Sequence, residues 1–459
     1  VPWAVHPSFS NRTSSSLVEP SARSHATCSG DCGNGAKVAT SQPRTTRCVP
    51  DTVQEVIPLS EAQQRVLDGV APLSPVQIAC NLAAGLVLAQ DVVASEHVPP
   101  FANTAVDGFA VRAADVAHVP VELRVIGTCA AGDGTEWHVG AGEALRIMTG
   151  APMPTGADAV VMVEDCEQPT RERVQVGKSV AVGAAVRPVA DDVRAGDTVF
   201  GAGSVLNAAG AGVLSSMNAR QVLVYPRARV ALLSTGDELV TDGSPLSRGQ
   251  IRESNLTMLE ILIAGSQCEV TNLGVIADDE ALLERTLRHA ASTHDAIVTS
   301  GGVSMGDFDV VKAVLSRIAE MQWMQMAVKP AKPFAFGLLS DAQRRVPVFG
   351  LPGNPVSSMI SFELLARPAL RKMMGHTQHL LRPTVRAVAD APLRRKPDGK
   401  VHFMRVFAHF ADDGRLHVRD SGPQGSHQLA ATAAANGLAL VPDGAGIDAG
   451  GSVDVLLLA

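Results

Sequence analysis

The chain has 459 residues, of which 46% are hydrophobic and 19% charged, and its net charge is −7. This composition suggests about three domains with substantial cores and argues against overall disorder. The sequence has no long basic stripe and only 3% aromatic residues, so neither nucleic acid nor an anionic membrane surface is an expected partner. No apolar run in the sequence reaches the length of a membrane-spanning helix.

Residues 1–50 are rich in Ser, Thr, Pro and Arg and poor in large apolar residues, which predicts a disordered extension. Cys28, Cys32 and Cys48, with His25, lack the paired short spacings of a zinc site. A transit peptide stays open because acidic residues are few, although no amphipathic face is evident. The chain has seven scattered cysteines, an odd number that favours reduced thiols and a cytoplasmic location.

The globular part begins near Val53. Ser60 with Gln63 has the pattern of a capping box and predicts a short helix, and Ser74-Pro75 predicts a second helix start. Residues 96–189 consist of short apolar runs separated by Gly, Pro and Asp, which predicts a small β-rich domain. The strands expected there include Val121–Ile126, Ala159–Val163 and Arg173–Val176.

Short apolar runs alternate with helix-like segments over residues 227–376. The expected strands are Val230–Leu233, Val270–Ile276, Ala296–Thr299 and Val348–Leu351, and the expected helices are Leu256–Ala264, Glu280–Ala290, Val310–Ile318 and Val356–Met373. This alternation predicts βαβ units around a buried parallel sheet. Further strands are expected at Val401–Phe410, Leu416–Val418, Leu438–Val441 and Val453–Leu458. They predict a small β-barrel or sandwich at the C-terminus.

Three unusual loops follow strands of this predicted sheet, at the edge where doubly wound sheets bind ligands. Glycines let backbone N–H groups approach an anion, and we expect each loop to open a helix whose N-terminus favours negative charge. One such loop alone would be an ordinary β–α connection, but three on one edge predict a phosphate or oxyanion site. The expected binding residues are Ser234, Thr235, Gly236, Ser300, Gly301, Gly302, Ser304, Pro352, Gly353, Asn354, Pro355 and Ser357, with positive charge from Lys329 and Lys332.

Two carboxylates, Glu238 and Asp309, occur in these loops, where an unpaired acid would repel an anion. Magnesium resolves the conflict because it binds one or two carboxylates together with phosphate oxygens. The alternative is that each carboxylate complements the dipole of a following helix. The sequence lacks the G-x-x-x-x-G-K-[ST] motif of phosphate loops and the H-E-x-x-H motif of zinc hydrolases.

The segments Pro99–Val111, Arg146–Pro152 and Gly156–Val161, together with the three loops, resemble the signatures of the molybdopterin molybdotransferase family, which includes the gephyrin E domain. The six motifs occur in order from about Val53 to the C-terminus. The resemblance implies a multidomain α/β plus β protein. Its expected parts are an elongated first domain from residues 51–95 and 190–226, an inserted β-domain at 96–189, a doubly wound molybdopterin-binding domain at 227–376 and a C-terminal β-barrel at 377–459.

The resemblance also implies an activity: insertion of molybdate into adenylylated molybdopterin with release of AMP, dependent on a divalent cation such as Mg²⁺. It implies a homodimer with the site shared between subunits, and it suggests a molybdopterin adenylyltransferase as a further partner. The catalytic positions carried over are Asp107, Thr149, Asp192, Glu238, Asp278 and Asp309, with Glu238 and Asp309 as metal ligands. Family positions also fall on Lys329, Pro352 and Pro355.

The chain departs from the family pattern at Ala102, Val106, Glu253, Gln325 and Ala331. None of these residues is an expected metal ligand, so the departures concern substrate affinity rather than reaction class.

Three alternatives remain open at this point. A scaffold that clusters other proteins would not need Glu238 and Asp309, and both are present. A nucleotide-cleaving enzyme that shares only the α/β domain would not need the Asp107 and Thr149 segments. A related enzyme acting on tungstate is not distinguished by the sequence, because molybdate and tungstate are both tetrahedral and similar in size.

Overall fold

The computed structural model describes residues 55–303, 310–341 and 344–458. The extension expected at residues 1–50 lies outside these ranges, as do two expected site residues, Ser304 and Asp309. Within the described ranges, no helix is both long and apolar enough to cross a membrane.

A seven-stranded sheet forms the centre of the α/β part, with the order β1-β19-β21-β22-β18-β14-β17. Its strands are β1 (Val56–Ile57), β14 (Arg229–Thr235), β17 (Glu269–Ile276), β18 (Ala296–Ser300), β19 (Ala319–Met326), β21 (Pro333–Asp341) and β22 (Arg344–Leu351). Neighbouring strands are parallel except around β21, which is antiparallel to both β19 and β22. The four predicted strands are confirmed, whereas β19 and β21 were not predicted and make the sheet mixed.

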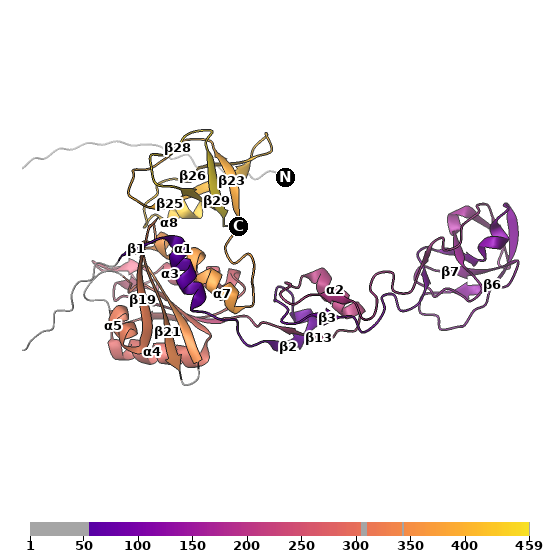
Figure 1. Ribbon diagram of the computed structural model, residues 1–459, viewed down its shortest axis with the longest axis horizontal. Coiled ribbons are helices and arrows are strands. Elements are labelled where there is room, and N and C mark those ends of the chain that lie inside the picture. The colour runs from indigo at the N-terminus through magenta and orange to yellow at the C-terminus, as the bar shows by residue number, and fades with distance from the viewer. Residues whose placement is uncertain (1–54, 304–309, 342–343, 459) are drawn as a thin grey trace, which may run out of the picture. The chain divides into compact units, whose positions relative to one another are not determined.

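Helices cover both faces of this sheet, so the doubly wound architecture is confirmed (Figure 1). Strand β14 shows why: Val230 and Leu232 belong to one buried cluster, whereas Ala231 and Leu233 belong to the other. A strand buried on both faces needs apolar residues at every position. The helices are α4 (Glu280–Thr293) and α5 (Val310–Ile318) on one face, and α1 (Leu59–Asp68), α3 (Asn255–Gly265), α6 (Pro355–Ser361) and α7 (Arg367–Met373) on the other.

The helix predicted at Val356–Met373 is divided into three parts. A π-helical segment, Phe362–Ala366, separates α6 from α7. Within it, the buried Glu363 accepts two hydrogen bonds from Arg382, from Nε at 2.9 Å and from Nη2 at 3.0 Å. This buried ion pair ties the helix to the segment that leads into the C-terminal domain.

Of the two helices predicted near the beginning of the fold, the first is confirmed without its capping box and the second is wrong. Helix α1 begins at Leu59, so Ser60 lies inside its first turn, and Gln63 donates a hydrogen bond to the Leu364 carbonyl at 3.0 Å instead of closing a capping box. Ser74-Pro75 precedes a strand, β2 (Val76–Ala79), rather than a helix. Pairing with β13 (Gln221–Val224) decides the conformation of β2.

The segments that lead into and out of the inserted domain run side by side as an antiparallel ribbon. Strand β3 (Val92–Val93) pairs with β12 (Thr198–Phe200), and β4 (Asn103–Thr104) pairs with β11 (Val186–Arg187). A single bridge between Val98 and Val193 lies between these two pairings. At the other end of the ribbon, β2, β13 and α2 (Ala208–Ser216) enclose a separate small core.

The inserted domain contains a six-stranded sheet with the order β8-β5-β7-β6-β10-β9, as its turn-rich sequence predicts. Its strands are β5 (Gly108–Val111), β6 (Val121–Cys129), β7 (Glu143–Ile147), β8 (Ala159–Met162), β9 (Cys166–Thr170) and β10 (Arg173–Val176). The sheet carries a buried cluster on each face, one around Phe109 and Val161 and one around Ala110 and Leu145. Strands β4 and β5 flank the loop that holds Asp107.

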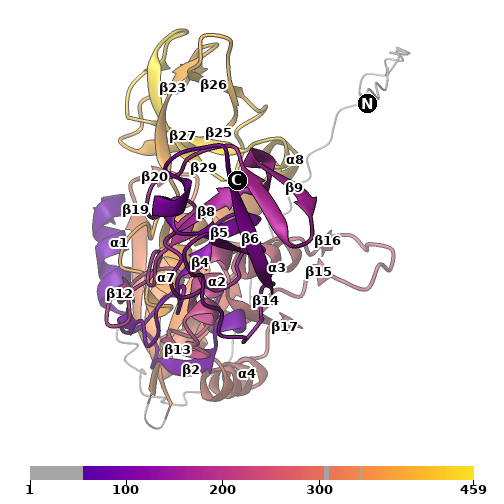
Figure 2. The ribbon, with the colours of Figure 1, turned by 90° about the vertical axis from the view of Figure 1, so that its right-hand side faces the viewer.

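The C-terminal strands close into the expected barrel, because β27 pairs with both β25 and β29 (Figure 2). The barrel strands are β23 (Thr384–Ala389), β25 (Val401–Phe410), β26 (Leu416–Asp420), β27 (Gly437–Val441) and β29 (Ser452–Leu457). A short strand from the α/β part, β20 (Val328–Lys329), adds to the edge of β25. The barrel is therefore joined to the α/β part by backbone hydrogen bonds as well as by the chain itself.

Candidate functional site

The carboxyl ends of three central strands lie in register. Ser234 at the end of β14 is level with Ser300 at the end of β18, and Ser300 is level with Leu351 at the end of β22. The Ser234 hydroxyl donates to the Ser300 carbonyl at 3.2 Å. The loops that follow these strands therefore begin at one edge of the sheet, as the sequence predicts.

A pocket of about 440 Å³ lies where these loops meet. This volume falls in the range of small-molecule sites. Its lining comes from the three loops and from a segment just before α3: Ser234, Thr235, Glu238, Leu239, Ile251, Arg252, Glu253, Ser254, Asn255, Ser300, Gly301, Gly302, Gly353, Asn354 and Pro355. Nine residues expected from the sequence are thus brought together. Pro352 and Ser357 belong to the third loop and are buried, but neither lines the pocket.

Two glycines of the pocket loops cannot carry a side chain. Gly302 has φ +74°, and a Cβ there would lie 2.2 Å from the Cβ of Val311. Gly236 has φ +140°, and a Cβ there would lie 2.5 Å from Oε2 of Glu238. The Glu238 carboxylate therefore lies against the backbone of Gly236, in space that a side chain at position 236 would occupy.

Glu238 does not stand at the start of a helix. The loop after β14 leads into β15 (Leu239–Val240), which pairs in parallel with β16 (Ile251–Arg252), and α3 begins only at Asn255. The expectation that each loop opens a helix is wrong for this loop, because the short strand pair intervenes. Complementation of a helix dipole is thereby removed as the explanation for Glu238.

The third loop does open a helix, α6, with Pro355 at its first position. The fixed φ of proline suits that position. Asn354 occupies the N-cap position, but its side chain makes no capping hydrogen bond. In this first turn Pro355 has no N–H, and the Val356 N–H donates to the Ser426 carbonyl at 3.1 Å, so these two positions offer no free donor to an anion.

Six of the lining residues were not among the predicted binding residues, and two of the six, Glu253 and Asn255, interact at the start of α3. The Glu253 carboxylate accepts hydrogen bonds from the backbone N–H groups of Asn255 and Leu256, each at 2.9 Å. Burial raises the pKa of Glu253, and these two N–H groups oppose that rise. The sequence signal was present, since Glu253-Ser254-Asn255 stands directly before a helical pattern and can cap its first turn.

Asp107 and Thr149 form a pair in the inserted domain. The Thr149 backbone N–H and hydroxyl both donate to Oδ1 of Asp107, each at 2.7 Å. These two hydrogen bonds lower the pKa of Asp107, first the backbone N–H and then the hydroxyl, with a further contribution from the Arg146 charge. The exposed Asp107 carboxylate is thereby held ionised and in one orientation.

The remaining predicted residues lie in several places. The Asp278 backbone N–H donates to Oδ1 of Asp237 at 3.2 Å, which places Asp278 beside the loop of Glu238. Asp192 is exposed on the ribbon next to Val98. Lys329 lines a different cavity, which it shares with His402 and other residues of the C-terminal domain. Lys332 is exposed after β20.

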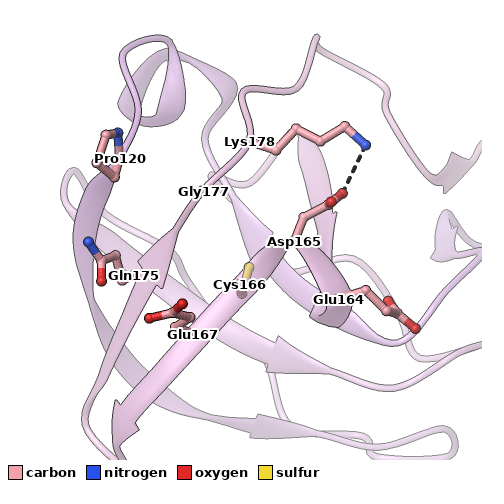
Figure 3. Close-up of a pocket in the computed structure, with 8 residues that line it drawn as sticks. All are labelled: Pro120, Glu164, Asp165, Cys166, Glu167, Gln175, Gly177 and Lys178. Carbon is pink, nitrogen blue, oxygen red and sulfur yellow. Dashed lines mark hydrogen bonds and ion pairs between the residues drawn. The ribbon is translucent and has the colours of Figure 1, made fainter.

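A further cavity of about 430 Å³, in the inserted domain, has a chemistry that does not suit an anion (Figure 3). Its lining includes the carboxylates of Glu164, Asp165 and Glu167. Lys178 pairs with Asp165 at 3.0 Å, so one cation faces three acids. Of these two cavities, the pocket at the sheet edge is therefore the one that fits a phosphate-bearing ligand.

Three family models match successive parts of the chain. They are the MoeA N-terminal region (domains I and II) at residues 57–218, the probable molybdopterin binding domain at residues 231–372 and the MoeA C-terminal region (domain IV) at residues 386–458. Together they span most of the described residues. The chain belongs to the MoeA family.

Named relatives agree along nearly their whole length. The chain is 35% identical to a molybdopterin molybdenumtransferase of Haemophilus influenzae over 382 residues, covering 83% of this chain and 93% of that protein. It is 36% identical to molybdopterin molybdenumtransferase 2 of Mycobacterium tuberculosis over 395 residues, 84% and 95% of the two chains. The crystal structure of the molybdopterin biosynthesis MoeA protein from Pyrococcus horikoshii superposes with a TM-score of 0.72 at 29% identity, covering 88% of this chain and 100% of that one.

One departure from the family pattern has a conformational effect. Ala331, in the Lys329–Pro333 segment where the family pattern has glycine, is buried and has φ +80°. A residue with a Cβ is strained in this left-handed region. Gln325, a second departure, is buried in β19.

We predict that Ala331→Gly stabilises the protein by about 0.5–1 kcal/mol, because relief of the left-handed strain exceeds the entropy that glycine adds to the unfolded chain. The measurement is thermal unfolding of the full chain. The matched control is Ala335→Gly in the neighbouring strand β21, where the same exchange on extended backbone should lower the melting temperature. A lower melting temperature for Ala331→Gly would contradict the assignment of strain.

Proposed function

We propose that this protein is a molybdopterin molybdotransferase, which inserts molybdate into adenylylated molybdopterin and releases AMP. The observation that carries the proposal is the pocket at the sheet edge, which three loops line with hydroxyls and glycines beside the carboxylates of Glu238 and Glu253. The names of the relatives support the same activity, since they are molybdopterin molybdenumtransferases that match this chain over more than nine-tenths of their length. The four described cysteines are free thiols, which supports a cytoplasmic location.

The pocket residues bind and orient the phosphate part of the substrate. The Thr235 and Ser300 hydroxyls line the pocket and can donate to phosphate oxygens, and the glycines of the loops leave room for those oxygens to approach. The Ser234 hydroxyl instead donates to the Ser300 carbonyl. Fixed donors of this kind lower a barrier without reorganising during the reaction. They hold the phosphate–phosphate linkage of the substrate in place while AMP departs and molybdate meets the two sulfur atoms of molybdopterin.

A divalent cation fits the pocket chemistry. Mg²⁺ binds one or two carboxylates and takes its other ligands from water and phosphate oxygens. Glu238 supplies such a carboxylate, and the described residues contain no group of three His, Cys, Asp or Glu side chains that could hold a metal ion unaided. A cation held by Glu238 and Asp309 would neutralise the phosphate charge and assist loss of the AMP leaving group.

The proposal includes a homodimer with a shared site. Asp107 and Thr149 form a pre-oriented anionic pair in the inserted domain, whereas Glu238 belongs to the α/β pocket. The family resemblance assigns these two groups to opposite subunits of one site. A molybdopterin adenylyltransferase, which makes the adenylylated substrate, is the partner that this chemistry requires upstream.

The direct test is AMP release by the purified full chain from adenylylated molybdopterin and Mg²⁺, with and without molybdate. We expect release that depends on both the protein and molybdate. The rate of AMP release is measured by chromatography and compared with a protein-free control. A rate no higher than in that control would refute the activity.

We predict that Glu238→Gln lowers the rate of AMP release by about 100- to 1000-fold at limiting Mg²⁺, with partial recovery at high Mg²⁺, because the neutral amide is a poor ligand for the cation. The melting temperature should change little. Asp309→Asn carries the same expectation. Glu260→Gln is the matched control, since Glu260 lies on α3, does not line the pocket and accepts a hydrogen bond from Asn272. Near-normal release by Glu238→Gln at limiting Mg²⁺ would rule out the metal role.

The shared site is tested with two isolated heterodimers. In the first, an Asp107→Ala subunit pairs with a Glu238→Gln subunit; in the second, a wild-type subunit pairs with a subunit carrying both substitutions. A shared site leaves the first heterodimer about half active and the second inactive. A site contained within one subunit gives the opposite pattern, so the two activities together decide between the arrangements.

A further inference from the structure

The side chain of Asn255 joins two of the three pocket loops. Its amide nitrogen donates to the Ser300 hydroxyl at 2.8 Å and to the Gly353 carbonyl at 2.8 Å. Ser300 ends β18 and Gly353 follows β22, while Asn255 itself begins α3. One buried side chain, 7% exposed, therefore fixes the spacing of the segments around the pocket.

The orientation of this amide follows from the chemistry of its partners. The Gly353 carbonyl can only accept a hydrogen bond, so the amide nitrogen rather than the oxygen must face it. The second N–H of the same nitrogen then donates to Ser300 Oγ. Glu253 fixes the backbone of Asn255 from the other side by accepting its N–H at 2.9 Å.

This arrangement determines the direction of the Ser300 hydroxyl. Because Ser300 Oγ accepts a hydrogen bond from Asn255 Nδ2, the hydroxyl proton of Ser300 must point away from Asn255. Among the described residues, no hydrogen bond donated by that hydroxyl is present, although Ser300 is only 1% exposed. A buried donor without an acceptor costs stability unless a ligand supplies one, and Ser300 lines the pocket.

We infer that Asn255 is a positioning residue: it holds the loops of Ser300 and Gly353 together and turns the Ser300 hydroxyl toward a phosphate oxygen of the bound ligand. The inference rests on the proposed function only for the choice of a phosphate-bearing ligand. The other polar atom of the Asn255 amide, the oxygen Oδ1, is buried and has no hydrogen-bond partner among the described residues. It is an acceptor for a donor group or a cation that accompanies the phosphate.

The test is a double-mutant cycle on Asn255 and Ser300. Calorimetry measures how tightly the full-length wild-type, single-variant and double-variant chains bind ADP in the presence of Mg²⁺. Ser300→Ala and Asn255→Leu should each raise the dissociation constant about 10- to 100-fold, the value of one hydrogen bond to a charged group. Because both substitutions remove the same contact, the double variant should bind no more than about threefold more weakly than the weaker single variant. Asn255→Ala, which cannot clash, carries the same expectation if Asn255→Leu does not fold.

Asn436→Leu is the matched control. Asn436 also clamps backbone groups, since it bonds to both the N–H and the carbonyl of Ala408, but it belongs to the C-terminal barrel. Its loss should lower the melting temperature and leave ADP affinity within about twofold of wild type.

Turnover gives a second readout. A lost ground-state contact raises KM and leaves kcat nearly unchanged, whereas partial unfolding lowers kcat and leaves KM unchanged. The inference would be overturned if the Asn255 variants bound ADP as tightly as the wild type. It would also be overturned if the fold-changes in dissociation constant of the two single variants multiplied in the double variant. Failure of the wild-type chain to bind ADP would overturn it as well. Failure of molybdate-dependent AMP release with an intact binding cycle would instead refute only the proposed function.

Discussion

The parallel register of β14, β18 and β22 is the constraint on which the site depends. It places Ser234, Ser300 and Leu351 level with one another, so three loops leave the sheet at one edge. That register is possible because both faces of the sheet are covered, which requires the uninterrupted apolar residues of β14 and β18. Polar contacts also hold the spacing of the loops, and those of Asn255 join segments as far as 98 residues apart in the sequence.

The sequence predicted those elements whose pattern is set locally. Four strands of the central sheet and the helices between them follow from continuous apolar runs and amphipathic spacing. Strand β19 was missed although residues 319–323 alternate between half-buried and exposed, a pattern typical of strands. Strand β21 was missed because Gly337 interrupts its apolar run. Gly337 is required by packing, since a Cβ there would lie 2.1 Å from Met321 Sδ. Such a contact between two strands is not visible in either segment alone.

The candidate site was predictable to a similar extent. Glycine-rich loops after strands identified the pocket, because their chemistry is local. The short strands β15 and β16 and the joining role of Asn255 depend on partners far along the chain, and no local pattern specifies them. The pairing of Asp107 with Thr149 likewise joins positions 42 residues apart. The positions of Ser304 and Asp309 remain expectations from the sequence, since both lie outside the described residues.

The antiparallel ribbon at residues 92–104 and 186–200 connects the inserted domain to the rest of the chain at a single place, so this domain is a cassette, a unit that could be removed or replaced as a whole. Because the outgoing and returning segments pair with each other, the two ends of the cassette are adjacent, and removing it would leave the host chain only a short turn to close. The entropic cost of closing a loop rises with its length, so a short turn costs less than a long loop. The host domain and the cassette can therefore fold and diverge independently, and the ribbon is the joint at which sequence could be exchanged without disturbing either core.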